Sequence, residues 1–253
     1  LSRNLRHEEI AGYVVTFDDI TQLQAAQRKA AWADVARRIA HEIKNPLTPI
    51  QLSAERLKRR YTKQISSDEE TFQNCVDTII RQVDHIGKLV GEFSSFARMP
   101  APNIKPENIV KVCKEELFLQ KHSHPDIQFE MDSPLKTLTF PCDREQMGQV
   151  LTNLIKNAIE AIEQKKIKDG HVTLSLKEEH SRVTLSIRDN GIGFPPVGRE
   201  RLTEPYVTFR EKGTGLGLAI VKKIVEDHSG KMSFHDQPDG GALVQIVFNI
   251  SSV

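Results

Sequence analysis

Residues 40–49 of this chain read AHEIKNPLTP, and the spacing of their polar side chains indicates a reactive face on a helix. At helical pitch His41 and Asn45 lie one turn apart on one face, with Glu42 beside them at about 100° around the axis. A neutral imidazole is a competent nucleophile toward phosphorus, and a carboxylate that accepts the second ring proton orients it. The two prolines that follow cannot donate to the carbonyls one turn earlier, so we expect the helix to bend or loosen there. These residues predict a phosphoryl-accepting histidine; the alternative is a solvent-facing histidine before a proline kink.

A long helix is expected around this stretch. Residues 21–63 contain no glycine, and their only prolines are the pair just described. Apolar side chains recur in steps of three and four, and the alternation breaks only across Pro46. They are Ala36, Ile39, Ile43, Leu47, Ile50, Ala54 and Leu57.

A second helix with a more regular apolar pattern follows. Residues 64–70 are polar, and Ser67 and Glu70 stand in capping-box register, which marks a turn and a new helix start. Two helices alone cannot bury two apolar seams, so we expect the hairpin to pair with a copy of itself as a four-helix bundle. Packing against the second half of the chain is the alternative. The second seam alternates strictly by four and three, as in a left-handed bundle, through Phe72, Val76, Ile79, Val83, Ile86, Val90, Phe93 and Ala97.

The composition argues against several classes of protein. Lys plus Arg number 35 and Asp plus Glu number 34 in 253 residues, so the net charge of +1 gives no reason to expect nucleic acid as a partner. The apolar runs fall short of the roughly 18 residues that cross a bilayer, and we expect a soluble piece excised from a longer chain. Cys75, Cys113 and Cys142 show no C-x-x-C pairing, which predicts ordinary thiols in a reducing cytosol and no metal site.

The second half of the chain changes to a mixed pattern. Residues 99–106 carry three prolines and predict a linker and a domain boundary. Beyond it the alternation of helix and strand patterns predicts a two-layer α/β sandwich. We expect helices at 107–120, 144–164 and 216–228, and strands at 127–131, 135–140, 171–177, 182–188, 231–235 and 242–249.

Two asparagines and one aspartate in this half suit a nucleotide. Asn153 and Asn157 lie one turn apart on one helix face, where their neutral oxygens can coordinate Mg²⁺ together with phosphate oxygens. Asp189 closes a strand and can accept a hydrogen bond from an adenine amino group, while Gly191 and Gly193 let backbone approach the base closely.

A glycine-rich turn opens the last expected helix, and free backbone N–H groups there suit a polyphosphate. Each string alone has an ordinary explanation, such as a cap or a plain turn, but in this order they predict a nucleotide site. The turn comprises Gly213, Thr214, Gly215, Leu216 and Gly217, preceded by the cations Arg210 and Lys212.

The stretch around His41 resembles the H-box of sensor histidine kinases, and the later strings resemble the N, G1, F and G2 boxes of the Bergerat ATP-binding fold that those kinases share with gyrase, Hsp90 and MutL. The resemblance implies that Asn157 is the Mg²⁺ ligand with Asn153 assisting, that Asp189 reads adenine, and that residues 194–212 form an ATP lid. Members that hydrolyse ATP carry a glutamate base where this chain has Asn153. That difference argues against an ATPase.

The resemblance is closest to the nitrogen-regulation sensor kinases of the NtrY type and covers nearly all of residues 11–250. It rests there on residues 203–208, TEPYVT, and 210–213, REKG. Phe209 stands where that type usually has threonine, and Ala242 stands in the remaining glycine box where many relatives carry a hydroxyl residue.

The resemblance also implies a division of the chain into five parts. They are the end of a PAS-like sensory domain (1–20), a signalling linker helix (21–34), a dimerisation and histidine phosphotransfer domain (35–99), a proline-rich hinge (100–106) and a catalytic ATP-binding domain (107–253).

The function implied is that of a dimeric sensor kinase, which phosphorylates His41 from Mg²⁺-ATP, passes the phosphoryl group to an aspartate of a response-regulator receiver domain, and dephosphorylates that partner with the help of Asn45. We expect a cytoplasmic fragment of an inner-membrane-anchored bacterial sensor, without nucleic-acid or membrane contact of its own. The alternative is a non-catalytic dimerisation scaffold whose nucleotide site is only regulatory.

Overall fold

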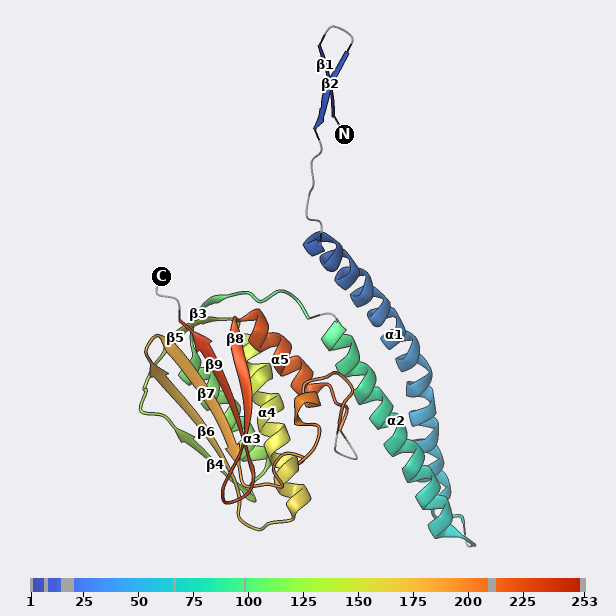
Figure 1. Ribbon diagram of the computed structural model, residues 1–253. Helices are drawn as coiled ribbons and strands as arrows, with labels where there is room; N and C mark the ends of the chain where they lie inside the picture. The colour runs from blue at the N-terminus through green and yellow to red at the C-terminus, as the bar shows by residue number, and fades with distance from the viewer. Residues whose placement is uncertain are drawn as a thin grey trace. The chain divides into compact units, whose positions relative to one another are not determined.

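The computed structural model describes residues 2–6, 9–14, 21–65, 67–97, 99–208 and 213–250. The chain divides into two compact units, Leu1–Arg98 and Met99–Val253. Figure 1 traces both units along the chain.

The first unit is built on a helical hairpin. Helix α1 (Thr21–Tyr61) and helix α2 (Glu69–Ala97) lie side by side, and the N-terminal part of the longer α1 extends beyond the end of α2 (Figure 1). Both helices were predicted, and α1 continues unbroken through Pro46 and Pro49. Each proline removes a single backbone donor, and the rest of the ladder carries the helix past it.

The seam predicted on α2 separates into two rows. Val76, Val83, Val90 and Ala97, spaced by seven residues, are buried within the hairpin. The alternate row is left open, since Ile79 is 43% and Ile86 is 40% exposed. A heptad pattern serves two neighbouring helices at once, and within one chain only the row that faces α1 is covered.

The same division holds on α1, where the small residues are buried and the large ones are open. Ala36, Ala40 and Ala54 are buried, whereas Ile39, Ile50 and Leu57 are 38%, 47% and 43% exposed. The hairpin therefore leaves a stripe of large apolar side chains uncovered in the single chain.

A β-hairpin precedes the helices. Strands β1 (Ser2–Arg6) and β2 (Glu9–Val14) pair antiparallel. Both strands lie within residues 1–20, the part that the sequence resemblance assigned to the end of a PAS-like domain.

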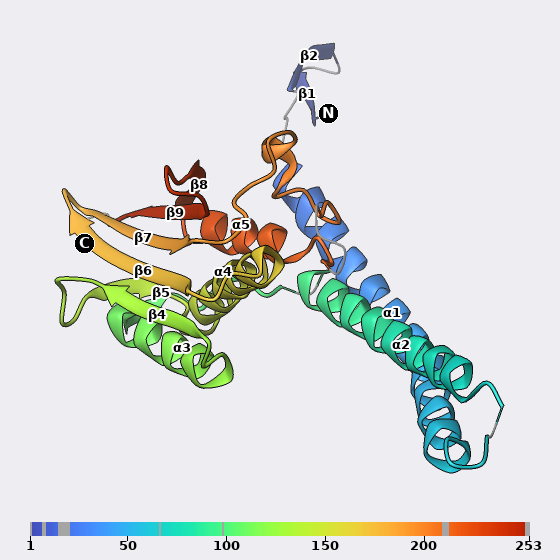
Figure 2. The same ribbon diagram turned by 90° about the horizontal axis from the view of Figure 1, so that it is seen from below.

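The second unit is the predicted two-layer α/β sandwich. Its five-stranded sheet has the order β4 (Ile127–Asp132), β6 (Gly170–Glu179), β7 (Arg182–Asp189), β9 (Ala242–Asn249) and β8 (Gly230–Asp236). The β4–β6 pair is parallel and the other pairs are antiparallel. Helices α3 (Ile109–Ser123), α4 (Arg144–Lys165) and α5 (Gly217–Asp227) cover one face, as Figure 2 shows.

The core of this unit lies between the sheet and the helices. Strict alternation on the two central strands directs one apolar row toward α4, and burying such a row is the main favourable term in folding. The fully buried side chains include Leu174, Leu176, Leu185, Ile187 and Ile246 from the sheet and Leu151, Ile155 and Ile224 from the helices.

Two predicted boundaries were wrong. Residues 105–108, assigned to the hinge and to the start of a helix, form strand β3 (Lys105–Asn108), which pairs antiparallel with β5 (Thr139–Cys142). Helix α3 starts two residues later than predicted because the Asn108 side chain caps it by accepting from the Lys111 amide at 3.3 Å. The strand expected at 135–140 is likewise shifted to β5.

Candidate functional site

The candidate acceptor face lies on α1 and is open to solvent. His41, Glu42 and Asn45 are all exposed. Within the described part of the chain no hydrogen bond joins the His41 ring to Glu42. Adjacent residues on a helix point about 100° apart, so the orienting role of Glu42 stays a prediction.

Asp189 stands at the end of β7 and is 6% exposed. Its Oδ1 accepts from the Gly191 amide at 2.8 Å, and the Ile192 amide donates to the Ala161 carbonyl of α4 at 3.2 Å. A Cβ on Gly191 would stand 2.6 Å from the Ala161 carbonyl carbon, so only glycine lets the turn pack on α4. The turn therefore holds the carboxylate against the helix layer.

A second glycine turn meets the same strand end. A Cβ on Gly241 would stand 2.0 Å from the Asp189 carbonyl oxygen, and one on Gly193 would stand 3.1 Å from the Gly241 carbonyl oxygen. Both residues have positive φ, +96° and +77°, which glycine adopts without strain. Lys165 closes the arrangement, because its Nζ donates to the Asn190 carbonyl at 2.8 Å.

The start of α5 has no side-chain cap. Leu216, its N-cap, makes no side-chain capping bond, whereas Asn108 and Asp143 cap α3 and α4. The first-turn N–H groups of a helix have no intrahelical partner, and together with the helix dipole they favour an anion. This helix end is therefore suited to phosphate.

Helix α4 brings a carboxamide to that helix end. The Asn153 Nδ2 donates to the Gln149 carbonyl at 2.9 Å, and its Oδ1 lies 3.2 Å from where a Cβ on Gly217 would stand. Asn157 lies one turn further along α4 and is half-buried. Among the described residues no three His, Cys, Asp or Glu side chains gather as a metal cluster, so Mg²⁺ here would depend on carboxamide and phosphate oxygens, which it accepts.

The loop before α5 is tied to the segment that precedes it. The Tyr206 amide donates to the Gly215 carbonyl at 3.0 Å, and a Cβ on Gly215 would stand 2.6 Å from the Tyr206 carbonyl carbon. The Thr214 hydroxyl accepts from the Leu216 amide at 3.4 Å. Arg210 and Lys212 lie outside the described residues.

A supporting residue pair was missed from the sequence. The Asp143 amide donates to Nε2 of the buried His228 at 3.0 Å, and the His228 Nδ1–H donates to the Ile224 carbonyl at 2.8 Å. This pair joins the N-terminus of α4 to the C-terminus of α5, the two helices that carry the candidate site. A possible signal was Asp143 directly before a helical pattern, the usual place of an N-cap.

The Asp143 carboxylate accepts from the Glu145, Gln146 and Asn103 amides. Burial raises the pKa of this carboxyl, but the three amide bonds outweigh burial and hold the pKa below its usual value. The charged form is thus the one that the fold stabilises.

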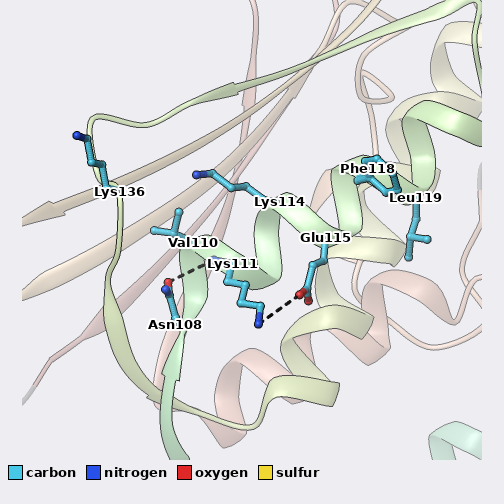
Figure 3. A pocket seen from close by; sticks show the side chains of 8 residues that line it. All are labelled: Asn108, Val110, Lys111, Lys114, Glu115, Phe118, Leu119 and Lys136. Carbon is cyan, nitrogen blue, oxygen red and sulfur yellow. Dashed lines mark hydrogen bonds and ion pairs between the residues drawn. The ribbon is translucent and has the colours of Figure 1, made fainter.

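A groove on the outer side of α3 lies apart from these residues. It encloses about 590 Å³, and none of the candidate site residues lines it. Figure 3 shows Lys114 and Lys136 over one part of the groove and Phe118 and Leu119 over another, with Lys111 paired to Glu115 at 4.0 Å.

None of the helices among the described residues has the length and apolar character needed to cross a membrane.

Comparisons with known proteins agree with the two-unit division. Residues 31–102 match the family model described as His Kinase A (phospho-acceptor) domain, and residues 142–252 match that of histidine kinase-, DNA gyrase B- and HSP90-like ATPase. The chain is 51% identical over 239 residues to nitrogen regulation protein NtrY of Azorhizobium caulinodans, covering 93% of this chain but 31% of that protein.

Two solved structures are similar. The catalytic domain of histidine kinase ThkA in a nucleotide-free form is 27% identical with a TM-score of 0.53, over 58% of this chain and 96% of that domain. ThkA in complex with the response regulator protein TrrA has a TM-score of 0.63 over 92% of this chain and 68% of that chain. At 23% identity the second is a likeness of fold.

Proposed function

Because the chain belongs to the sensor histidine kinases of the NtrY type, we propose that it transfers the γ-phosphoryl group of Mg²⁺-ATP from its second unit to His41. The observation that carries this proposal is the junction of α4 and α5, where Asn153 lies against Gly217 at a helix start without a side-chain cap. Carboxamide oxygens for a hard cation and free N–H groups for phosphate meet there, which is the donor set that a magnesium nucleotide needs.

Each candidate residue has one role in the proposal. Asp189 accepts from the adenine amino group while Gly191 and Gly193 keep the backbone close to the base. Asn157 ligates Mg²⁺ with Asn153 assisting. The phosphates lie on the turn of Gly213, Thr214, Gly215, Leu216 and Gly217, with Arg210 and Lys212 as counter-charges.

Bound Mg²⁺-ATP would supply the γ-phosphoryl group, and the protein would supply the acceptor. A neutral carboxamide cannot take a proton from water, so Asn153 does not activate a water molecule for hydrolysis. His41 is the acceptor instead: its neutral ring nitrogen bonds to the γ-phosphorus as the bond to ADP breaks, and Glu42 accepts a hydrogen bond from the other ring N–H, which stabilises the imidazolium that forms. The rate would come mostly from positioning and charge neutralisation.

The proposed partners are a second copy of the chain and a receiver domain. The uncovered apolar stripe of the helical hairpin supports a four-helix bundle made of two chains. The phosphoryl group then passes to an aspartate of a response regulator, the class of partner present in the ThkA complex.

We extend the proposal to the parts of the chain. Residues 1–20 end a PAS-like domain, 21–34 form a signalling linker helix and 35–99 the dimerisation and phosphotransfer domain. Because β3 belongs to the second unit, the expected hinge of 100–106 shortens to 100–104 and the catalytic domain begins at 105 instead of 107. The whole sensor is anchored in a bacterial inner membrane, with this part in the cytoplasm.

The test is incubation with γ-labelled ATP and Mg²⁺. We expect label on the protein that is lost in acid and kept in base, as for a phosphoramidate. His41→Gln is the matched variant, because it should bind nucleotide as the parent does and take up no label. Acid-labile label on His41→Gln would refute the acceptor assignment, whereas nucleotide binding without any labelling of the parent would favour the scaffold alternative.

A further inference from the structure

The segment of residues 194–208, called the lid segment below, has almost no core of its own. No residue from Ile192 to Thr208 is buried, and Val197 and Tyr206 are 79% and 56% exposed. A segment with few buried contacts has low local stability, so its position depends on a small number of specific contacts.

The two ends of the lid segment are held to different elements. At the far end Tyr206 is bonded to Gly215, as described above. At the near end the Phe194 ring meets Phe234 of β8 edge-on, with ring centroids 5.3 Å apart and an angle of 76°. These contacts hold the two ends of the lid segment. The position of the residues between them depends on a further contact.

Arg199 makes the contact that reaches from this stretch to the sheet. One guanidinium nitrogen donates to both carboxylate oxygens of Asp236, at 2.6 Å each, and Asp236 is the last residue of β8. The guanidinium carbon also lies 5.4 Å from the centroid of the Phe194 ring. Arg199 thus contacts both β8 and Phe194, the first residue of the lid segment. The nearby Arg201 pairs instead with Glu204 of the lid segment itself, at 3.1 Å.

We propose that Arg199 is a positioning residue that anchors the lid segment to β8 and thereby raises the affinity for nucleotide. The proposal rests on the function proposed above, in which this segment belongs to the ATP lid. A lid segment that is already held in place loses less conformational entropy when the nucleotide binds. The contact between Arg199 and Asp236 therefore raises affinity by ordering the lid segment, without touching the nucleotide. The pair is partly exposed, and such pairs contribute little to overall stability.

The first measurement is hydrogen–deuterium exchange of the lid segment without nucleotide. Arg199→Ala and Asp236→Ala should each raise exchange across residues 197–206, and Arg201→Ala should not, because its ion pair stays within the segment. Unchanged exchange in Arg199→Ala would overturn the anchor. This readout needs no ATP, so it stands even if the proposed function fails.

The second measurement is the dissociation constant for Mg²⁺-ATP with the rate of self-phosphorylation at saturation. Arg199→Ala should weaken affinity about three- to tenfold with the saturated rate nearly unchanged, and Arg199→Lys should recover part of the loss. Arg199→Ala combined with Asp236→Ala should lose no more than Arg199→Ala alone, because the ion pair with Asp236 is already absent in that variant. Additive losses, or a saturated rate that falls as much as the affinity, would contradict an anchor that acts through lid order.

Discussion

At the scale of single residues, Asp189 is the clearest test of nucleotide recognition. Asp189→Asn keeps an oxygen that can accept from the Gly191 amide, so the turn should persist. It loses the charged acceptor for the adenine amino group, and bonds to charged groups contribute about 1.5–3 kcal/mol, so ATP affinity should fall roughly 10- to 100-fold.

Calorimetric titration of ATP measures this loss directly. Asp239→Asn is the control, because that carboxylate is 90% exposed on the neighbouring turn. We expect no labelling of His41 in Asp189→Asn at limiting ATP. Equal affinity in the parent and Asp189→Asn would remove Asp189 from adenine recognition.

The three cysteines should differ sharply in reactivity. Burial raises the pKa of the Cys113 and Cys142 thiols to about 12, whereas Cys75 is exposed. Thiolate is the reactive form, so one equivalent of iodoacetamide should react with the native protein near pH 8 and three after denaturation. Mass spectrometry counts the adducts, with Cys75→Ser as the control that should lose the native adduct. Rapid native labelling of Cys113 would contradict its burial.

Asn45 lies one turn beyond His41 and is exposed. A carboxamide can donate to and accept from one water, so we expect it to align water for attack on the aspartyl phosphate of the response regulator. Asn45→Ala should leave His41 labelling near normal and slow dephosphorylation of the regulator roughly 10²-fold. Both rates should be measured on one preparation. Equal losses would show instead that Asn45 supports the helix beside the two prolines.

Local spacing explains which candidate site residues could be proposed from the sequence. Asn153, Asp189 and the glycine turns stand at fixed offsets from a helix or strand end, and such offsets can be read along the chain. Arg199 and Asp236 are 37 residues apart, and Asp143 and His228 are 85 apart. Local sequence patterns do not predict contacts between residues so far apart in the sequence, so these pairs could be identified only from the structure.

At the scale of elements, the missed strand β3 has a plain physical reason. It reads Lys105–Asn108, KPEN, and carries two charges, a proline and no β-branched residue. It forms because β5 offers a partner, and Pro106 stands opposite Pro141 in a ribbon of two strands where missing donors are tolerated. The sandwich itself was predictable, since its long helices and central strands have strong periodicity.

Asp143 provides a test at the N-terminus of α4. It is the N-cap, and loss of such a cap costs about 1 kcal/mol, so Asp143→Ala should lower the free energy of unfolding at pH 7 by that amount or more. The pKa of Asp143 is lower in the folded protein than in the unfolded chain, where it is about 3.9. Its charge therefore adds fully to the free energy of unfolding above about pH 3.9, and this contribution is lost as the pH falls through the folded pKa.

Urea titrations of parent and Asp143→Ala at neutral pH and near pH 3 measure both effects. The difference should be large at pH 7 and smaller in acid. Asp126→Ala, on an exposed turn, is the control and should change neither. A difference that grew on acidification would contradict the sign of the pKa shift.

At the scale of the whole molecule, the apolar surface of the first unit predicts assembly. A monomer rarely leaves many large apolar side chains of one region in water, and here Ile39, Ile50, Leu57, Ile79 and Ile86 are each 38–47% exposed. The sequence pattern predicted one seam per helix, but only the structure separated the row that closes the hairpin from the row that is left for a partner.

That separation gives two substitutions with different outcomes. Val83 is 7% exposed within the hairpin, whereas Ile86, three residues later, is 40% exposed. Ile86→Asp should leave the hairpin folded and abolish the dimer, because a two-fold interface buries the new charge twice and each unpaired charge costs several kcal/mol. Val83→Asp places the charge between α1 and α2 of one chain, so it should lower helicity as well.

Lys88→Asp, at an exposed position of the same helix, is the control for charge reversal. Light scattering at low micromolar concentration and circular dichroism separate the cases. A dimeric Ile86→Asp would show that the exposed row is not the interface and that the four-helix bundle is wrong, whereas a monomer with parental helicity would place the second chain on that row.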